Sequence, residues 1–188
     1  ELRGVFGITD AVDGEHADAI YDELSAKLAQ PSFSPRALFE QFRIETLATT
    51  DAATDTLDAH RRLAADGWAG RVRPPFRPDA LMQIGMDGWV GHVEELSERA
   101  GVPIRTYAQF VQAIEARRQE FRRLGATATD HAVVAPRTLR LDASELEATF
   151  RRALRGRLRM GEAEQFQAHF LVEMARMSSE DGLVMQIH

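Results

Sequence analysis

The sequence predicts an α/β fold in which parallel strands are joined by crossover helices, after a helical lead-in over residues 1–43. Short apolar segments alternate with amphipathic helical segments from Ile44 onward. Four strand segments fall within residues 44–188, and polar residues suited to chemistry follow each of them. An eight-stranded β/α barrel needs about 250 residues. The chain therefore predicts either an open sheet or half of a barrel.

Composition limits the classes of function. The chain has 188 residues, of which 44% are hydrophobic, and a net charge of -6. This length is enough to bury a core. The acidic balance argues against a nucleic-acid partner, because no basic excess is present to release counterions from a phosphate backbone. Arginines do cluster in 117–123 and 151–159, but they recur at helical spacing among glutamates, so we interpret them as solvated helix faces.

Cysteine is absent, which excludes disulfides and thiolate chemistry and fits a reducing compartment. No apolar run is long enough to cross a bilayer, and no signal-peptide pattern is present. We therefore predict a cytoplasmic protein without a membrane partner. Because the sequence starts at Glu1 and stops at His188 directly after an apolar run, we also expect it to be a segment of a longer protein.

The lead-in is predicted to contain two helices. Residues 15–29 carry apolar side chains at helical spacing and are followed by Pro31. Ser34 and Pro35 are typical of an N-cap and a first-turn proline, which predicts a short helix through Phe42.

The repeating part follows from periodicity and capping signals. Strands are expected at 44–49, around Val72, at 126–129 and at 183–188, and helices at 56–65, 87–100, 106–124, 142–158 and 161–177. Pro74 and Pro75 remove ladder donors and place the end of the second strand early. Thr106 is a predicted N-cap, and Asp142 with Glu145 has capping-box spacing. Glycines at 101 and 182 are predicted helix stops.

Side chains suited to chemistry recur where the strands end. These are Asp51, Arg77 with Asp79, Asp130 with His131, and His188. The carboxyl ends of parallel strands form the active face of α/β folds. We therefore expect these side chains to lie together at one shared mouth, the opening at that end of the sheet. Pro78 pushes Arg77 into extended geometry, and a planar guanidinium suits a carboxylate ligand.

Each of these residues also has a structural interpretation. Asp51 is placed to cap the following helix, and Arg77 to pair with Asp79. The 130–131 dipeptide is typical of a turn, and His188 of a core histidine. The other histidines fall within predicted helices and are interpreted as surface or packing residues: His16, His60, His92 and His169.

Five short segments occur in a fixed order along the chain. They are Gly4–Ile8, Ala48–Asp51 followed by Asp55, Leu57 and His60, Phe76–Asp79, Thr129–His131, and Val184–His188. In order and spacing they resemble the uronate isomerase family, also called glucuronate isomerase, over essentially the whole chain. The resemblance implies that the chain is the middle of a longer amidohydrolase-superfamily protein, and that its strands form part of a TIM-type (β/α)8 barrel with extra helices.

The resemblance also implies a reaction. It is the interconversion of D-glucuronate with D-fructuronate, and of D-galacturonate with D-tagaturonate, by proton transfer between C2 and C1. A small hexuronate would be the partner. Assembly as a homo-oligomer is left open, because the sequence does not reveal the oligomeric state. The implied residues are Arg77, Asp79 and Asp51 for substrate binding and His188, Asp130 and His131 for catalysis. His188 is also expected either to ligate a divalent metal, with zinc favoured and the other ligands outside this segment, or to hydrogen-bond a substrate oxygen, and the sequence does not separate these two roles.

The chain departs from the family pattern at two places. The family's Thr-Thr-Asp-Asp-Pro is Thr-Thr-Asp-Ala-Ala over 49–53, which changes the turn after the first strand. Its Asp-His-Gly ends in Ala132 here, which reduces backbone freedom beside His131. Two further functions stay open, a metal-dependent hydrolase of the same superfamily and a non-catalytic sugar-acid-binding fragment.

Overall fold

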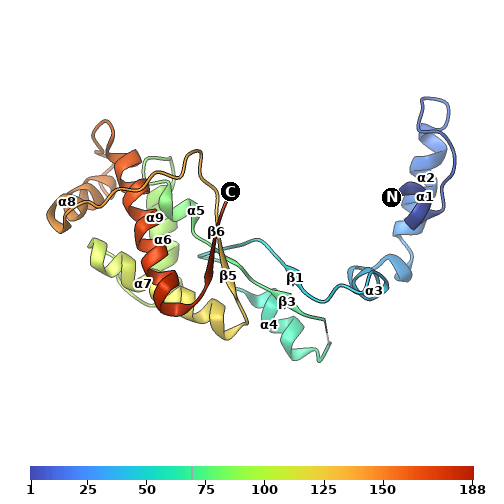
Figure 1. Ribbon diagram of the computed structural model, residues 1–188, viewed down its shortest axis with the longest axis horizontal. Helices are drawn as coiled ribbons and strands as arrows, with labels where there is room; N and C mark the ends of the chain where they lie inside the picture. Colours follow the sequence, from blue (N-terminus) through green and yellow to red (C-terminus); the bar gives the residue numbers. More distant parts are fainter. Residues whose placement is uncertain (69) are drawn as a thin grey trace. The chain divides into compact units, whose positions relative to one another are not determined.

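The structure is a computed structural model that describes residues 1–68 and 70–188 (Figure 1). Its contacts divide the chain into two compact units. The first comprises Glu1–Leu47 with residues 70–71, and the second Ala48–Trp68 with Val72–His188. The predicted boundary lies between residues 43 and 44, and the observed one between 47 and 48. Within the described ranges, no helix is long and apolar enough to span a membrane.

The first unit is helical. It contains α1 (Leu2–Phe6), α2 (Ala17–Leu28), the short 3-10 helix η1 (Pro31–Phe33) and α3 (Pro35–Gln41). Ser34 caps α3, because its hydroxyl oxygen accepts from the backbone N–H of Ala37 at 3.4 Å. Both predicted lead-in helices are therefore confirmed. The five-residue α1 was not predicted, since so short a segment shows no helical period.

The second unit contains a four-stranded sheet of entirely parallel strands in the order β2-β4-β5-β6. The strands are β2 (Asp51–Ala52), β4 (Phe76–Arg77), β5 (Ala128–His131) and β6 (Val184–Ile187). A separate two-stranded sheet pairs β1 (Leu47–Ala48) with β3 (Val72–Arg73). The parallel, sequential order confirms the predicted α/β class and is the order that consecutive units of a β/α barrel have.

The first two strand predictions were wrong in position. The segment 44–49 and the segment around Val72 supply β1 and β3 of the small sheet, and the main sheet starts only at β2 and β4. Pro74 and Pro75 end β3, but the chain pairs again directly after them. Strands of two residues are too short to show the alternation on which the prediction depended.

Helices connect successive strands of the main sheet. They are α4 (Asp58–Ala65) after β2, α5 (Asp79–Met82), α6 (Trp89–Ala100) and α7 (Tyr107–Arg123) after β4, and α8 (Ala143–Ala153) and α9 (Glu162–Asp181) after β5. The caps form at the predicted residues, although the capping box is at Thr106 and not, as predicted, at Asp142. Thr106 and Gln109 form a capping box, and Asp142 accepts from two backbone N–H groups of α8. Gly101 and Gly182 end α6 and α9 in left-handed conformation, with φ of 64° and 77°.

The two faces of the main sheet differ in burial. Successive side chains of a strand point to opposite faces, and residues paired across parallel strands share a face. The register thus defines a covered face with Asp51, Phe76, Thr129, His131, Met185 and Ile187, and an open face with Ala52, Arg77, Asp130, Gln186 and His188. Ile187, at the edge of the sheet, is the exposed member of the covered face. Phe76 and Thr129 are both fully buried. Helices α6, α7 and α9 lie together on one side of β5 and β6 (Figure 1).

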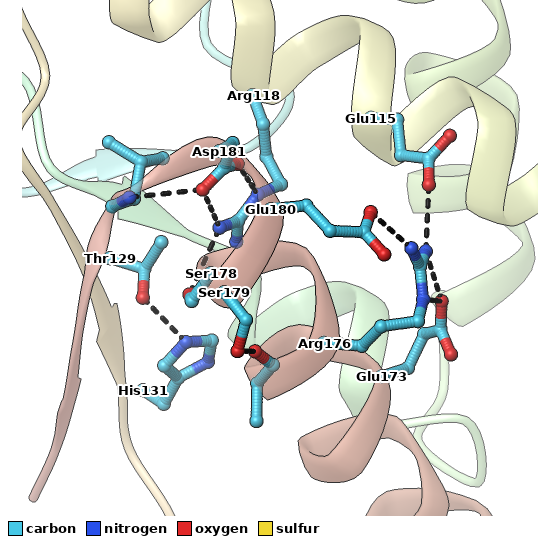
Figure 2. Close-up of polar contacts among 12 residues, drawn as sticks. Glu115, Arg118, Thr129, His131, Glu173, Arg176, Ser178, Ser179, Glu180 and Asp181 are labelled. Carbon is cyan, nitrogen blue, oxygen red and sulfur yellow. Dashed lines mark hydrogen bonds and ion pairs between the residues drawn. The ribbon is translucent and has the colours of Figure 1, made fainter.

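Helix α7 carries two buried arginines, so the prediction of a solvated arginine face is wrong for them. Arg117 and Arg118 are 2% and 1% exposed, whereas Arg122 is exposed. Arg118 donates from Nε and Nη2 to the two carboxylate oxygens of Asp181, at 2.6 and 3.0 Å (Figure 2). Its guanidinium also lies over the ring of Phe76. Because α7 packs against neighbours on more than one side, only part of its arginine run reaches water.

Candidate functional site

Four ionisable side chains meet at the carboxyl edge of the open face. Nε of Arg77 donates to Oδ2 of Asp79 at 2.6 Å, and its Nη1 lies 3.8 Å from Oδ2 of Asp130. Nε2 of His188 lies 2.8 Å from Oδ1 of Asp130. We call Arg77, Asp79, Asp130 and His188 the edge cluster. It contains four of the six residues predicted for the site.

The register explains why three of these residues converge. Phe76 pairs with Thr129, so the next residues, Arg77 and Asp130, occupy one row of the open face. Asp130 pairs with Gln186, and His188 lies two residues further along the same face. His188 extends the strand pairing, because its N–H donates to the backbone oxygen of His131 at 3.0 Å.

Asp79 braces the cluster from the start of α5. Its Oδ2 accepts from Arg77, and its Oδ1 accepts from the backbone N–H of Ala132 at 3.0 Å. The predicted ion pair between Arg77 and Asp79 is therefore present in the structure. The hydrogen bond to Asp79, aided by the charge of Asp130, raises the pKa of Arg77, so the guanidinium stays charged. Among the described residues, Nη2 of Arg77 makes no hydrogen bond, which leaves one side of the fork for a ligand.

The pair of Asp130 and His188 adds proton-carrying groups beside this guanidinium. The His188 side chain is 57% exposed and that of Asp130 is 21% exposed, so a ligand can reach both. An imidazole held by a carboxylate can accept or donate a proton near neutral pH. The edge cluster thus combines an anion-binding fork with acid–base groups.

Asp51 lies on the covered face, apart from the edge cluster. Its carboxylate oxygens lie 3.2 and 3.3 Å from Nε2 of His60 in α4, and one accepts from the hydroxyl of Thr49. The interpretation of Asp51 as a helix cap is wrong, because α4 begins after Leu57. His60, 7% exposed, was predicted only as a surface or packing residue. The feature of the sequence that could have pointed to His60 is its position in the segment that begins at Ala48 and resembles the family.

His131 also lies on the covered face, although Asp130 beside it lies on the open one. It is fully buried, and its Nε2 is 2.9 Å from the hydroxyl oxygen of Thr129 (Figure 2). Burial lowers the pKa of His131 to about 4, so it is neutral at neutral pH. The 130–131 dipeptide belongs to β5 and is not a turn. The expectation of one shared mouth therefore holds for the edge cluster and not for Asp51 or His131.

At both positions where the chain departs from the family pattern, Ala53 and Ala132, the backbone N–H donates a hydrogen bond at this edge. The N–H of Ala53 donates to the backbone oxygen of Arg77 at 2.9 Å, a bond that a proline at this position could not make. The N–H of Ala132 donates to Asp79, as described above. Both bonds tie loops to residues of the edge cluster.

A groove of about 580 Å³ opens beside the cluster. Its lining includes Met82 at the end of α5, Ala132 and Val133 after β5, and Gln167 and Leu171 of α9. Because the N–H of Ala132 is bonded to Asp79, the groove starts next to the edge cluster. The groove is lined by residues next to the edge cluster and by none of its four members.

The side chains at the edge do not make a complete metal site. Across residues 1–68 and 70–188, no group of three or more His, Cys, Asp or Glu side chains is arranged to hold a metal ion. The cluster offers one imidazole, His188, whose Nε2 is engaged with Asp130. Catalytic metal sites usually take three protein ligands. Among the described residues, the edge cluster by itself does not supply three such ligands.

Comparison with known proteins identifies relatives along the whole chain. The profile of the glucuronate isomerase family matches residues 1–188. The uronate isomerase of Nostoc punctiforme is 50% identical over 188 residues, and that of Brucella canis is 45% identical over 187 residues. Each alignment covers 100% of this chain and 40% of the relative.

Solved structures agree with the sequence comparison. The crystal structure of glucuronate isomerase from Caulobacter crescentus matches with a TM-score of 0.93 and 39% identity, over 100% of this chain and 39% of that one. The uronate isomerase of Thermotoga maritima matches with a TM-score of 0.91 and 30% identity, over 100% of this chain and 41% of that one. The chain spans about two fifths of the length of these relatives. Because the family profile matches from the first residue to the last, the chain belongs to the glucuronate isomerase family.

Proposed function

We propose that the protein containing this chain is an aldose–ketose isomerase that interconverts D-glucuronate with D-fructuronate and D-galacturonate with D-tagaturonate. One observation carries the proposal, namely the edge cluster on the open face of a chain that belongs to this family. The cluster offers the kinds of group that a sugar acid and a proton transfer require.

The reaction sets three demands. A base must take the proton from C2, a second group must stabilise the negative charge that develops on the enediol oxygens, and a third must hold the distant carboxylate. A proton then returns at C1, the oxygen on C1 gains a proton and the hydroxyl on C2 loses one, so the carbonyl group moves from C1 to C2. Holding the carboxylate at a fixed point places C1 and C2 against the groups that move the proton.

Arg77 is the proposed contact for the substrate carboxylate. Its Nε is committed to Asp79 at 2.6 Å and its Nη1 lies 3.8 Å from Asp130, which fixes the plane of the guanidinium and leaves Nη2 to a ligand. A planar guanidinium held in this way is better suited to the task than a mobile ammonium group. Alternatively, Arg77 contacts the enediol oxygens, whose developing negative charge its positive charge would stabilise.

Asp130 and His188 are the proposed proton carriers. They lie 2.8 Å apart and beside Arg77, so a carboxylate-bound sugar would have its carbon chain close to both. The covered-face residues Asp51 and His131 are not assigned a substrate contact, because both lie among protein groups. Their roles in substrate binding and catalysis stay predictions.

Other properties of the whole protein also stay predictions. These are a divalent metal at His188, with zinc favoured, a homo-oligomeric assembly, a cytoplasmic location, and the absence of nucleic-acid and membrane partners. Measuring the metal content of the purified protein checks the first, and its mass in solution checks the second.

The test is a coupled assay on the intact protein with D-glucuronate and D-galacturonate. We expect the corresponding ketouronates to form. The same preparation is offered a panel of amides and esters, on which we expect no turnover. Hydrolysis of the panel without ketouronate formation would favour a hydrolase of the same superfamily. Binding of the uronates without turnover would favour a non-catalytic sugar-acid binder.

A further inference from the structure

The guanidinium of Arg117, in the middle of α7, is engaged at all three of its nitrogens. Its side chain is 3% exposed. Nε donates to the backbone oxygen of Ala53 at 2.9 Å, Nη2 to that of Asp55 at 2.6 Å, and Nη1 to Glu120. Burying a guanidinium costs free energy unless its donors are satisfied, so these acceptors indicate what the side chain does there.

Both backbone oxygens belong to the turn that follows β2. The N–H of Asp55 closes this turn by donating to the oxygen of Ala52 at 2.9 Å. Ala53 connects the turn to the next strand, because its oxygen accepts from Arg117 while its N–H donates to the backbone oxygen of Arg77 at 2.9 Å. A continuous chain of hydrogen bonds therefore leads from the buried guanidinium to the backbone of Arg77.

Arg77 is consequently held at two points. Asp79 fixes the side chain, and Ala53 fixes the backbone from which that side chain departs. Pro78 follows directly and restricts the same stretch of backbone. The position of the guanidinium in the edge cluster depends on both attachments.

We propose that Arg117 is a positioning residue for the isomerisation, which fixes the turn at Ala53 and through it the place of the Arg77 guanidinium. This inference rests on the proposed function, in which Arg77 binds the sugar acid. Loss of the clamp would let the turn relax and shift the fork relative to C1 and C2. A misplacement of about 1 Å can cost roughly 100-fold in rate.

The test uses three variants of the intact protein. Arg117→Met removes the clamp, and Arg117→Lys keeps the charge but cannot reach both oxygens with a planar fork. Glu120→Gln is the control, because it removes the charge that faces Nη1 of Arg117 and Arg61, keeps an oxygen acceptor there, and leaves the bonds to Ala53 and Asp55 in place. If Arg117→Met does not fold, Arg117→Lys serves for every measurement below.

Two measurements separate positioning from a merely structural role. Amide hydrogen exchange over residues 51–57 should be faster in Arg117→Met than in wild type or Glu120→Gln. The kcat/KM for D-glucuronate should fall by roughly 10- to 100-fold in Arg117→Met, by less in Arg117→Lys, and not in Glu120→Gln. Unchanged exchange over 51–57 in the folded variants would overturn the inference, whatever the activity.

A double-mutant cycle tests the link to Arg77. In the Arg77→Met background, Arg117→Met should change kcat/KM by less than about twofold, because the group that it positions is gone. Fully additive losses would show that Arg117 acts elsewhere and would overturn the inference. If wild-type protein turns over no uronate while Arg117→Met still exchanges faster over 51–57, the proposed function fails and the clamp stands as a structural contact.

Discussion

The open and covered faces of the main sheet separate chemistry from stability, sometimes between neighbouring residues. Phe76 is fully buried against the ring of Phe121, whereas the next residue, Arg77, reaches the edge cluster. Asp130 contacts His188 on the open face, whereas His131 is buried and neutral on the covered one. A residue at the end of a strand therefore belongs to the edge cluster only if its side chain also points to the open face.

The largest effect is expected from Phe76→Ala. This change leaves a cavity under α7, where the ring packs edge-on against Phe121 at a centroid distance of 5.2 Å. The free energy of unfolding should fall by about 3–5 kcal/mol. Denaturant unfolding of the intact protein measures it, with Gln186→Ala on the open face as the control that should change stability by less than about 0.5 kcal/mol. Equal losses in the two variants would contradict the distinction between the faces.

A pH dependence is expected from His131. The pKa of this residue is about 4 in the folded protein and about 6.5 when unfolded, so between these values the unfolded state binds more protons. Its contribution to stability is therefore complete above pH 6.5 and falls as the pH is lowered toward 4, by about 3 kcal/mol. Unfolding curves from pH 7.5 to 4 measure the slope. His131→Gln, which does not titrate, should show a smaller slope, and an unchanged slope would disprove the assignment.

His188→Asn should act on turnover and leave stability nearly unchanged. The imidazole is more than half exposed and meets Asp130 on the open face, so its loss removes a proposed proton carrier without opening a cavity. We expect kcat for D-glucuronate to fall by roughly 30-fold, or about 2 kcal/mol. Metal content measured on the same samples tests whether His188 is also a ligand. Wild-type turnover with unchanged metal content would remove both roles.

Asp79→Asn should have the smallest effect. The amide keeps an acceptor for the N–H of Ala132 but loses the charge that holds Nε of Arg77. We expect kcat/KM to fall by about tenfold, near 1.4 kcal/mol, through a less well oriented fork. Stability should change by less than about 1 kcal/mol, as is usual for partly exposed ion pairs. A rise in KM with little change in kcat would place the effect on binding of the sugar acid.

Helix ends could be predicted from the sequence because their determinants are local. Ser34, Thr106 and Asp142 accept hydrogen bonds from the first turns of their helices, as their residue types indicated. Gly101 and Gly182 adopt the left-handed conformation that a helix stop favours. Such signals depend on a few neighbouring residues and on no distant contact.

The site could be predicted only in part, because the sequence does not show the strand register, and the register decides which side chains share a face. The sequence placed Arg77 correctly at an edge, with Pro78 as the local signal. It ended the third strand at Thr129, whereas the strand continues to His131, and alternation then turns His131 away from Asp130.

Long-range contacts of charged residues escaped prediction altogether. Arg117 bonds the turn after β2 more than sixty residues earlier, and His60 meets Asp51 only once α4 folds back. In the sequence, Arg117 looks like the other arginines of a charged helix. Its burial is set by which side of α7 faces the sheet, and that follows only from the tertiary packing.

The most direct test of the account is the effect of Arg77→Met on the intact protein, measured as kcat/KM for ketouronate formation beside the free energy of unfolding. We expect a loss of about 100-fold in kcat/KM, with stability within about 1 kcal/mol of wild type, because the side chain contacts the ligand and is not part of the core. Wild-type turnover in this folded variant would contradict the assignment of Arg77. It would also contradict the proposal that the open face carries the chemistry and the covered face the stability.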